Sequence, residues 1–448
     1  MPRLPPSSAA VAFLVVWLGF FTALQWSVVR YRLGIVIVLT SATVLLAVAL
    51  VRRWRLSVLP RPVLAAAIVG AAVVAQAVPF FSHAAPGDRR LLAHVVSGAC
   101  LLCAAVLLAF GRRAARAATT VAGAGVIAWT ALAVALVPAP RIDVWVTLQQ
   151  AADGLAHGRD AYTMVWHDSP GIQDAFTYLP WTSVLLAPGR WLAGDVRWAL
   201  LVALLVGLAC TAAMGLPRRR GQGRRPDGEP AESAVALSCG AATLLALAPG
   251  SVTQAEQAWT EPLLFACLAG WALLVRRGHA WWAVLPLALG CASKQHLALL
   301  LPVLACWPAF GWRRTVATGG LAGVLVLPWF VASPAAMWHD TVSLLVTFHP
   351  IRFANTWFIT SLNELGRTPP FWLTGLVVLG VLGSACWAVH RRRPDLPELL
   401  GWLALLLLVA NLVNKQAFYN QFWLVGALVA LAVAASGSPD HPSRGATS

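Results

Sequence analysis

Hydrophobic positions fill most of the chain in runs that polar segments interrupt. A helix of roughly 20 apolar residues crosses the hydrocarbon core of a bilayer, so each run predicts a membrane helix. Together with two shorter apolar segments, the pattern predicts an all-α, polytopic integral membrane protein with about 13–15 membrane helices. The apolar runs are 11–29, 33–51, 63–81, 91–110, 118–137, 197–216, 234–248, 259–275, 315–331, 371–389, 396–412 and 421–435.

Two segments depart from this regular pattern. Residues 179–191 are apolar but short and contain Pro180 and Pro188, which fits either a bent crossing or a helix lying at the interface. Residues 281–310 lie between arginine clusters expected on one side of the membrane, yet two full crossings need about 40 residues. A shallow helical hairpin with its turn near Lys294 resolves this conflict, and it places a charge at membrane depth.

Composition supports membrane insertion and explains the net charge. Of 448 residues, 59% are hydrophobic and 11% are charged, with a mean hydropathy of +0.72, which exceeds the apolar share of soluble proteins. The charge of +16 is concentrated in short clusters between apolar runs, such as 52–55, 218–220 and 391–393. This is the positive-inside pattern rather than a nucleic-acid surface. It places both termini in the cytoplasm and the loop 138–180 outside.

The predicted helices fall into successive units. Residues 1–117 form an accessory four-helix membrane bundle, and residues 118–332 form a membrane module with the outer loop 138–180. Residues 333–437 contribute a second outer loop and three C-terminal membrane helices. The polar segment 438–448 is predicted to be a disordered tail.

The loop 138–180 is long and rich in carboxylates. Asp153 and Asp160 lie in or beside an amphipathic surface helix over 145–157, so solvation explains them, and Asp168 and Asp174 lie among Gly, Ser and Pro, where turn chemistry is usual. Asp143 differs because it is fixed where the chain leaves a membrane helix, and a positioned carboxylate can act as a general base. We therefore predict Asp143 as the catalytic residue. The spacing of the His and Asp residues in this loop matches no established metal site, and none is predicted.

Lysine is rare in this chain: 31 of the 33 basic residues are arginine, and only Lys294 and Lys415 are lysine. Both are followed by glutamine and lie between apolar segments on the predicted outer side. An ionisable residue at membrane depth indicates a functional site, although a lysine can also extend to the headgroups for solvation. The residues that accompany the two lysines are Gln295, His296, Gln416 and Tyr419.

Two further outer segments carry polar side chains. The turn 249–261 contains Gln254 and Glu256, and its Glu261 begins a helix, where a carboxylate is favoured in any case. The segment 333–370 mixes Trp, Asn and charged residues, including Arg352. That mixture suits a sugar or a lipid phosphate, and interfacial anchoring explains the Trp residues equally well.

Residues 118–435 carry an ordered series of short motifs. They are Asp143, the run Asp153 to Tyr162, Tyr178-Leu-Pro180 with Trp181, the Gln254 turn before Arg276-Arg277-Gly278, and Lys294-Gln295 before Leu297 to Leu304. In this order the motifs resemble those of the GT-C superfamily of membrane glycosyltransferases, in particular the bacterial polyprenyl-phosphate-mannose-dependent mannosyltransferase branch. The chain departs from the family in having Ile142-Asp143 instead of an adjacent acidic pair and Tyr-Leu-Pro instead of Tyr-Pro-Pro.

The resemblance implies an inverting transferase that moves a sugar, mannose or another hexose or pentose, from a polyprenyl-phosphate donor to an envelope glycan or lipid acceptor. Asp143 would deprotonate the acceptor, and Lys294, with Arg352 or Lys415, would hold the phosphate. It implies no cofactor, and it places the active site on the outer face of a bacterial plasma membrane. The predicted substrate-binding residues are Lys294, Gln295, His296, Arg352, Lys415, Gln416, Tyr419, Arg141, Tyr178, Gln254 and Glu256.

Two alternatives remain open at the level of the sequence. A transporter or flippase for polyprenyl-linked glycans could also use buried lysines and an outward polar cavity, and a non-enzymatic membrane protein of envelope assembly could share the composition. A transporter should show related halves, and no internal repeat is visible in the sequence. The acidic residues also gather at one surface, which favours the enzyme.

Overall fold

The computed structural model describes residues 6–111, 113–217 and 229–437, and within them every regular element is a helix. The predicted tail 438–448 and most of the linker after Pro217 lie outside these residues. The elements in chain order are α1 (Pro6–Ser27), α2 (Leu33–Val51), α3 (Arg61–Ala77), α4 (Pro86–Ala109), α5 (Ala114–Leu136), α6 (Asp143–Ala156), η1 (Ala161–Thr163), α7 (Trp181–Ala193), α8 (Arg197–Ala213), α9 (Glu229–Ala246), α10 (Ser251–Glu256), α11 (Glu261–Arg276), α12 (Val284–Ser293), η2 (Gln295–Leu300), α13 (Leu301–Ala305), α14 (Gly311–Ala332), α15 (Pro334–Trp338), η3 (His339–Ser343), α16 (Leu344–Thr347), α17 (Trp357–Leu365), α18 (Phe371–Arg392), α19 (Leu396–Val413) and α20 (Tyr419–Ser436).

The all-α, multi-pass prediction is confirmed. Among the described residues, eight helices are long and apolar enough to cross a membrane, or up to nine if the bent pair α7–α8 is one span. This is fewer than the expected 13–15 membrane helices, because several apolar runs form helices of 10–17 residues. α7 and α8 differ in direction by 117°, so the two helices do not form one straight span.

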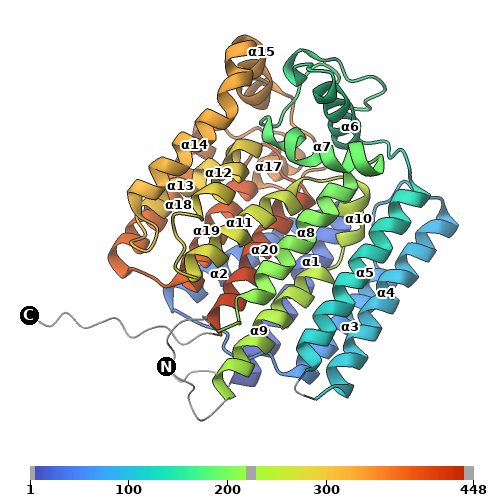
Figure 1. Ribbon diagram of the computed structural model, residues 1–448, viewed down its shortest axis with the longest axis vertical. Coiled ribbons are helices and arrows are strands. Elements are labelled where there is room, and N and C mark those ends of the chain that lie inside the picture. Colours follow the sequence, from blue (N-terminus) through green and yellow to red (C-terminus); the bar gives the residue numbers. More distant parts are fainter. Residues whose placement is uncertain (1–5, 112, 218–228, 438–448) are drawn as a thin grey trace, which may run out of the picture.

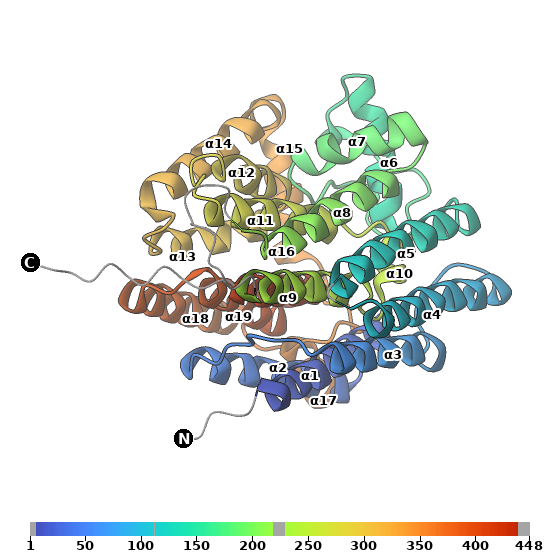
Figure 2. The same cartoon turned by 60° about the horizontal axis from the view of Figure 1, so that its bottom comes forward.

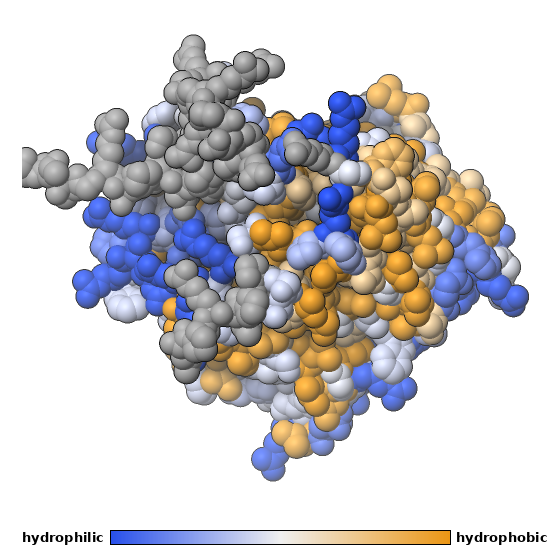
Figure 3. All heavy atoms as spheres, turned by 90° about the horizontal axis from the view of Figure 1, so that it is seen from below, coloured by the Kyte–Doolittle hydropathy of each residue, from blue (hydrophilic) through white to orange (hydrophobic). Residues whose placement is uncertain are grey.

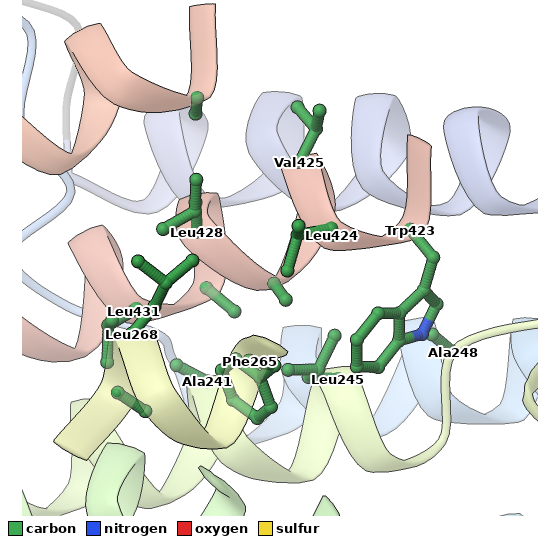
Figure 4. Packing of buried hydrophobic residues seen from close by; sticks show 14 of the residues in the cluster. Ala241, Leu245, Ala248, Phe265, Leu268, Trp423, Leu424, Val425, Leu428 and Leu431 are labelled. Carbon is green, nitrogen blue, oxygen red and sulfur yellow. The ribbon is translucent and has the colours of Figure 1, made fainter. Parts of the chain in front are cut away.

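The helices form layers around α19 and α20 (Figure 2). α20 packs on α9 and α11, and α19 packs on α2. Figure 4 shows Trp423, Leu424 and Leu428 of α20 directed at Leu245 of α9 and Phe265 of α11. These buried apolar side chains interdigitate, which stabilises the centre of the molecule through dense packing.

The N-terminal helices share this core. α1 packs against α20 as well as α3, and α5 packs against α9. One continuous hydrophobic cluster runs from Leu14 and Phe21 in α1 to Leu428 in α20. The segment 1–117, predicted as an accessory bundle, is thus joined to the rest of the protein by buried apolar contacts.

The chain segments between helices gather at two ends. At one end Arg55 pairs with Asp395 at 2.5 Å, and Arg392 donates to the carbonyl of Leu50, so the basic clusters 52–55 and 391–393 lie together as their common charge predicts. Arg277 donates to the carbonyl of Pro217. Figure 3 looks onto this end, where hydrophilic patches adjoin hydrophobic surface. α6, α7 and α15 lie at the opposite end (Figure 1).

Candidate active site

Asp143 is the first residue of α6, directly after the extended residue Ile142. Its Oδ1 accepts a hydrogen bond from the backbone N–H of Val144 at 2.8 Å, and the N-terminus of a helix favours a carboxylate. The loop backbone at Gly171 lies against the other oxygen, since a Cβ there would come within 2.7 Å of Oδ2. This covering removes water, and burial raises the pKa of Asp143 above its ordinary value.

The other carboxylates of the same loop have structural partners or are exposed. Asp153 forms a two-point ion pair with Arg190 of α7, at 2.8 and 2.9 Å, where the sequence predicted only a solvated face. Asp160 caps η1 and accepts a hydrogen bond from Ser333. Asp168 is exposed with a φ of +60°, a backbone conformation typical of turn Asp and Asn residues.

Tyr178 lies at the end of this loop and is almost fully buried. Its ring packs on Phe176, which in turn contacts Tyr162, and the Tyr162 hydroxyl donates to the carbonyl of Tyr178 at 2.8 Å. Burial, and then the charges of Asp143 and Glu261, raise the pKa of Tyr178 well above its ordinary range. Two carboxylates that are far apart in the sequence therefore act electrostatically on Tyr178.

Lys294 lies between α12 and η2, where the backbone becomes extended (φ −149°, ψ 121°). The break frees the carbonyl of Ser293, which accepts from the N–H of Leu179 at 3.1 Å and the hydroxyl of Thr182 at 2.6 Å. A helix can be interrupted in a membrane protein when other protein groups satisfy its backbone in this way. These bonds bring Lys294 to the start of α7 and to Tyr178.

The Lys294 ammonium has a carboxylate partner. It donates to Glu261 Oε1 at 2.6 Å and to the Thr260 hydroxyl at 3.2 Å, and it lies 5.5 Å from the centre of the Tyr178 ring. The Glu261 side chain is fully buried, whereas 14% of the Lys294 side chain is exposed. We call Asp143, Tyr178, Glu261 and Lys294 the Tyr178 cluster.

Glu261 was missed by the sequence analysis as a site residue. Its place at the start of a predicted helix already explained a carboxylate, and nothing in the local sequence points to a lysine 33 positions later. A single acid at the outer end of an apolar helix was the only available signal.

Gln295 connects the cluster to the segment 333–370. Its amide Nε2 donates to the carbonyls of Thr177 and Thr341, at 3.4 and 3.2 Å. Beside it, Asp340 accepts from the N–H of Phe176 at 2.7 Å. The segments 138–180 and 333–370 therefore meet over the break at Lys294.

Lys415 lies between α19 and α20 and contacts the segment 333–370 further along the chain. Its ammonium donates to the carbonyls of Val346 and Phe348. Among the described residues no carboxylate lies within 4.0 Å of it, and burial lowers its pKa. The ring of Phe353 packs against Phe418 at 5.6 Å, so the exposed Arg352 belongs to the same region.

Glu256 and Gln254 lie on α10 and face the N-terminal helices. Glu256 is fully buried and accepts hydrogen bonds from the Ser82 hydroxyl and the His83 N–H, which tie the loop between α3 and α4 to α10. Gln254 is also buried, and neither of its amide atoms has a protein partner in the described part of the chain. Glu256 therefore holds α10 to the loop between α3 and α4, and it is not part of the Tyr178 cluster.

The remaining predicted residues are dispersed. Arg141 is exposed before α6, and His296 is half-buried in η2. The Tyr419 hydroxyl donates to the carbonyl of Pro249 at 2.9 Å, with its ring stacked on Trp259, and the Gln416 carbonyl oxygen is buried without a described partner.

A buried ion pair that the sequence did not reveal supports α6. Arg197 is 1% exposed and binds Asp195 at two points, and the Trp145 indole donates to the same carboxylate at 3.1 Å. Across the described ranges, no three His, Cys, Asp or Glu side chains come together as a metal site would require.

No protein-family model matches the chain, and no curated protein matches it. A similar solved structure is that of ArnT from Cupriavidus metallidurans in the apo state, with a TM-score of 0.40 and 15% sequence identity. The alignment covers 66% of this chain and 54% of that one, so the chain spans about half the length of its structural relative.

Proposed function

We propose that this protein is a membrane glycosyltransferase of the GT-C type, which moves a sugar from a polyprenyl-phosphate donor to a hydroxyl group of an envelope glycan or lipid. The observation that carries the proposal is the Tyr178 cluster: the Lys294 ammonium lies 5.5 Å from the centre of the Tyr178 ring, and the charge of Asp143 acts on the same tyrosine. A carboxylate anchored at the start of a helix, together with a lysine at a break between apolar helices, suits chemistry on a lipid-linked substrate.

Asp143 is the general base in this proposal. It takes the proton of the acceptor hydroxyl, the acceptor oxygen attacks the anomeric carbon, and the bond from that carbon to the phosphate oxygen breaks on the opposite face. The electron pair leaves with the polyprenyl phosphate, and the anomeric configuration inverts. The raised pKa of Asp143 makes its carboxylate a stronger proton acceptor than an exposed aspartate.

The phosphate gains negative charge as it leaves, so a nearby cation lowers the barrier. We assign this role to Lys415 with Arg352 in preference to Lys294. Glu261 already neutralises the Lys294 ammonium, whereas the described partners of Lys415 are uncharged carbonyls. A phosphate can replace those carbonyls without leaving a carboxylate unpaired.

The finer assignments belong to the same proposal. The sugar is mannose or another hexose or pentose, both termini are cytoplasmic, and the site faces the outer side of a bacterial plasma membrane. The gathering of the basic clusters at the end opposite α6 and α7 supports this orientation.

The decisive test compares Asp143→Asn with Asp168→Asn in purified protein given labelled polyprenyl-phosphate sugars. Loss of a general base should reduce transfer by about 10²–10⁴-fold. Asp168→Asn is a matched control, because this residue is exposed and asparagine tolerates its positive φ. Transfer that survives Asp143→Asn contradicts the assignment of the base. Passage of a polyprenyl-linked glycan across liposomes without sugar transfer would favour a flippase instead.

The pH dependence gives a second prediction for Asp143. The base must be ionised, and burial raises its pKa, so kcat/KM should fall with decreasing pH at a higher pH than an exposed aspartate would cause. A kcat/KM profile of the wild type measures this acidic limb, with thermal melting at each pH as the control for unfolding. A midpoint at or below the ordinary aspartate value of about 3.9 would contradict a buried base.

A further inference from the structure

The polar atoms left without a partner around Lys294 are hydrogen-bond acceptors. Glu261 Oε2 is buried and has no hydrogen-bond partner in the described structure, and the same holds for Gln295 Oε1. The rest of each side chain is fixed: Glu261 Oε1 binds Lys294, and Gln295 Nε2 binds the carbonyls of Thr177 and Thr341. Leaving a buried acceptor unsatisfied is costly, so two such atoms beside one lysine indicate a missing donor.

Both acceptors belong to the neighbourhood of residues 177 and 178. Gln295 reaches the carbonyl of Thr177, and the Lys294–Glu261 pair lies at the Tyr178 ring, with Glu261 close enough to raise the pKa of Tyr178. Asp143 acts on the same tyrosine. A group held by these acceptors would therefore lie in the Tyr178 cluster, where the charge of the proposed base is also felt.

We infer that Glu261 and Gln295 bind hydroxyl groups of the donor sugar and that Glu261 determines which sugar is accepted. This inference rests on the proposed function. A phosphate does not suit these positions, because its oxygens are themselves acceptors and Lys294, the nearby donor, is already paired with Glu261. Sugar hydroxyls supply several neutral donors at once, and a hydrogen bond to a charged carboxylate is among the stronger ones.

Glu261 has this role rather than that of a base. Its Oε1 is already engaged by the Lys294 ammonium at 2.6 Å. An oriented carboxylate with one oxygen free can recognise a hydroxyl at a defined position. A site that hydrogen-bonds a hydroxyl rejects the analogue lacking it, because the buried acceptor is then left unpaired.

The test uses polyprenyl-phosphate mannose, glucose and arabinose to find the sugar that the wild-type protein transfers, followed by monodeoxy analogues of that sugar. In the wild type, one deoxy position should lower kcat/KM by about 10–100-fold. Glu261→Ala and the isosteric Glu261→Gln should lower kcat/KM for the complete donor, and Glu261→Ala should abolish the discrimination at that position. Equilibrium binding of the same lipids measures the discrimination without turnover. It can therefore be measured even for a variant that is folded but catalytically inactive.

Thr260→Val is the matched control, because it removes the hydrogen bond from Lys294 to the Thr260 hydroxyl and leaves both carboxylate oxygens of Glu261 in place. It should retain the discrimination. If Glu261→Ala and Glu261→Gln both retain it too, the inference is overturned while the proposed function stands. Absence of transfer and of binding for all three donors would overturn the proposed function and the inference with it. A purely structural role of Glu261 would lower activity for every donor equally.

Discussion

The two lysines of the chain occupy similar positions, each at a break between apolar helices and each followed by glutamine, but their surroundings differ. Lys294 binds the buried carboxylate of Glu261 and the Thr260 hydroxyl. Lys415 binds main-chain carbonyls of Val346 and Phe348 in the segment 333–370. The lysine of the first break thus has a carboxylate partner, whereas the described partners of the second are neutral carbonyls.

This difference assigns a structural role to Lys294 and leaves Lys415 available to bind an anionic substrate. A buried carboxylate that loses its cation is strongly destabilising, because the charge stays away from water without compensation. A lysine whose partners are neutral carbonyls leaves no buried charge behind when it is removed. The Lys294 region should therefore be sensitive in folding, and the Lys415 region should be sensitive in the binding of an anionic substrate.

The largest expected effect is that of Lys294→Met on stability. The substitution leaves the fully buried Glu261 without its cation, and breaking a buried pair in this way costs about 3–5 kcal/mol. Thermal melting in detergent should show a clear fall in Tm. The double variant Lys294→Met/Glu261→Gln removes both charges and should recover most of the loss. A double variant as unstable as Lys294→Met alone would contradict the charge explanation.

Lys415→Met should have the opposite signature. Burial lowers the pKa of Lys415, so the folded protein disfavours its charge, and the loss of two hydrogen bonds to carbonyls is partly offset when that charge is removed. We expect a change in Tm smaller than that of Lys294→Met and a fall in kcat/KM for the lipid-phosphate donor of about 10–100-fold. Lys415→Arg should restore part of the activity, since it restores the charge. Unchanged kcat/KM in Lys415→Met would remove Lys415 from the phosphate site.

Much of the fold follows from the sequence, because hydrophobic length is a strong physical constraint in a bilayer. The surface helix expected over 145–157 is observed as α6, and the polar break expected near Lys294 separates α12 from η2. Where the structure departs from expectation, the cause is tertiary. α7 turns by 117° from α8, and the Pro residues of 179–191 do not by themselves decide between a bent span and a surface helix.

The candidate site is less predictable than the fold, because its pairing depends on contacts between distant segments. The sequence distinguishes Asp143 from the other acids by its position at a helix end, and it distinguishes the lysines by their rarity. It does not show that Glu261 is the partner of Lys294, or that Glu256 binds Ser82 and His83. Periodicity and composition describe single helices, whereas these pairs depend on how helices far apart in the chain are placed.

The smallest effect that distinguishes the two regions concerns the glutamines that follow the lysines. Gln295 donates to the carbonyls of Thr177 and Thr341 and so connects the segments 138–180 and 333–370. The buried side-chain oxygen of Gln416, by contrast, has no described partner. Gln295→Ala should destabilise the protein by about 1 kcal/mol, the net value of a typical buried hydrogen bond. Gln416→Ala should change stability by less than about 0.5 kcal/mol, because it removes an unsatisfied acceptor.

Hydrogen exchange gives a local measurement: amides around 176–178 and 341 should lose protection in Gln295→Ala and keep it in Gln416→Ala. Equal losses of protection in the two variants would mean that Gln295 and Gln416 contribute equally to holding the segments 138–180 and 333–370 together. The contrast between a structural Lys294 and a substrate-binding Lys415 would then not extend to the glutamines that follow them.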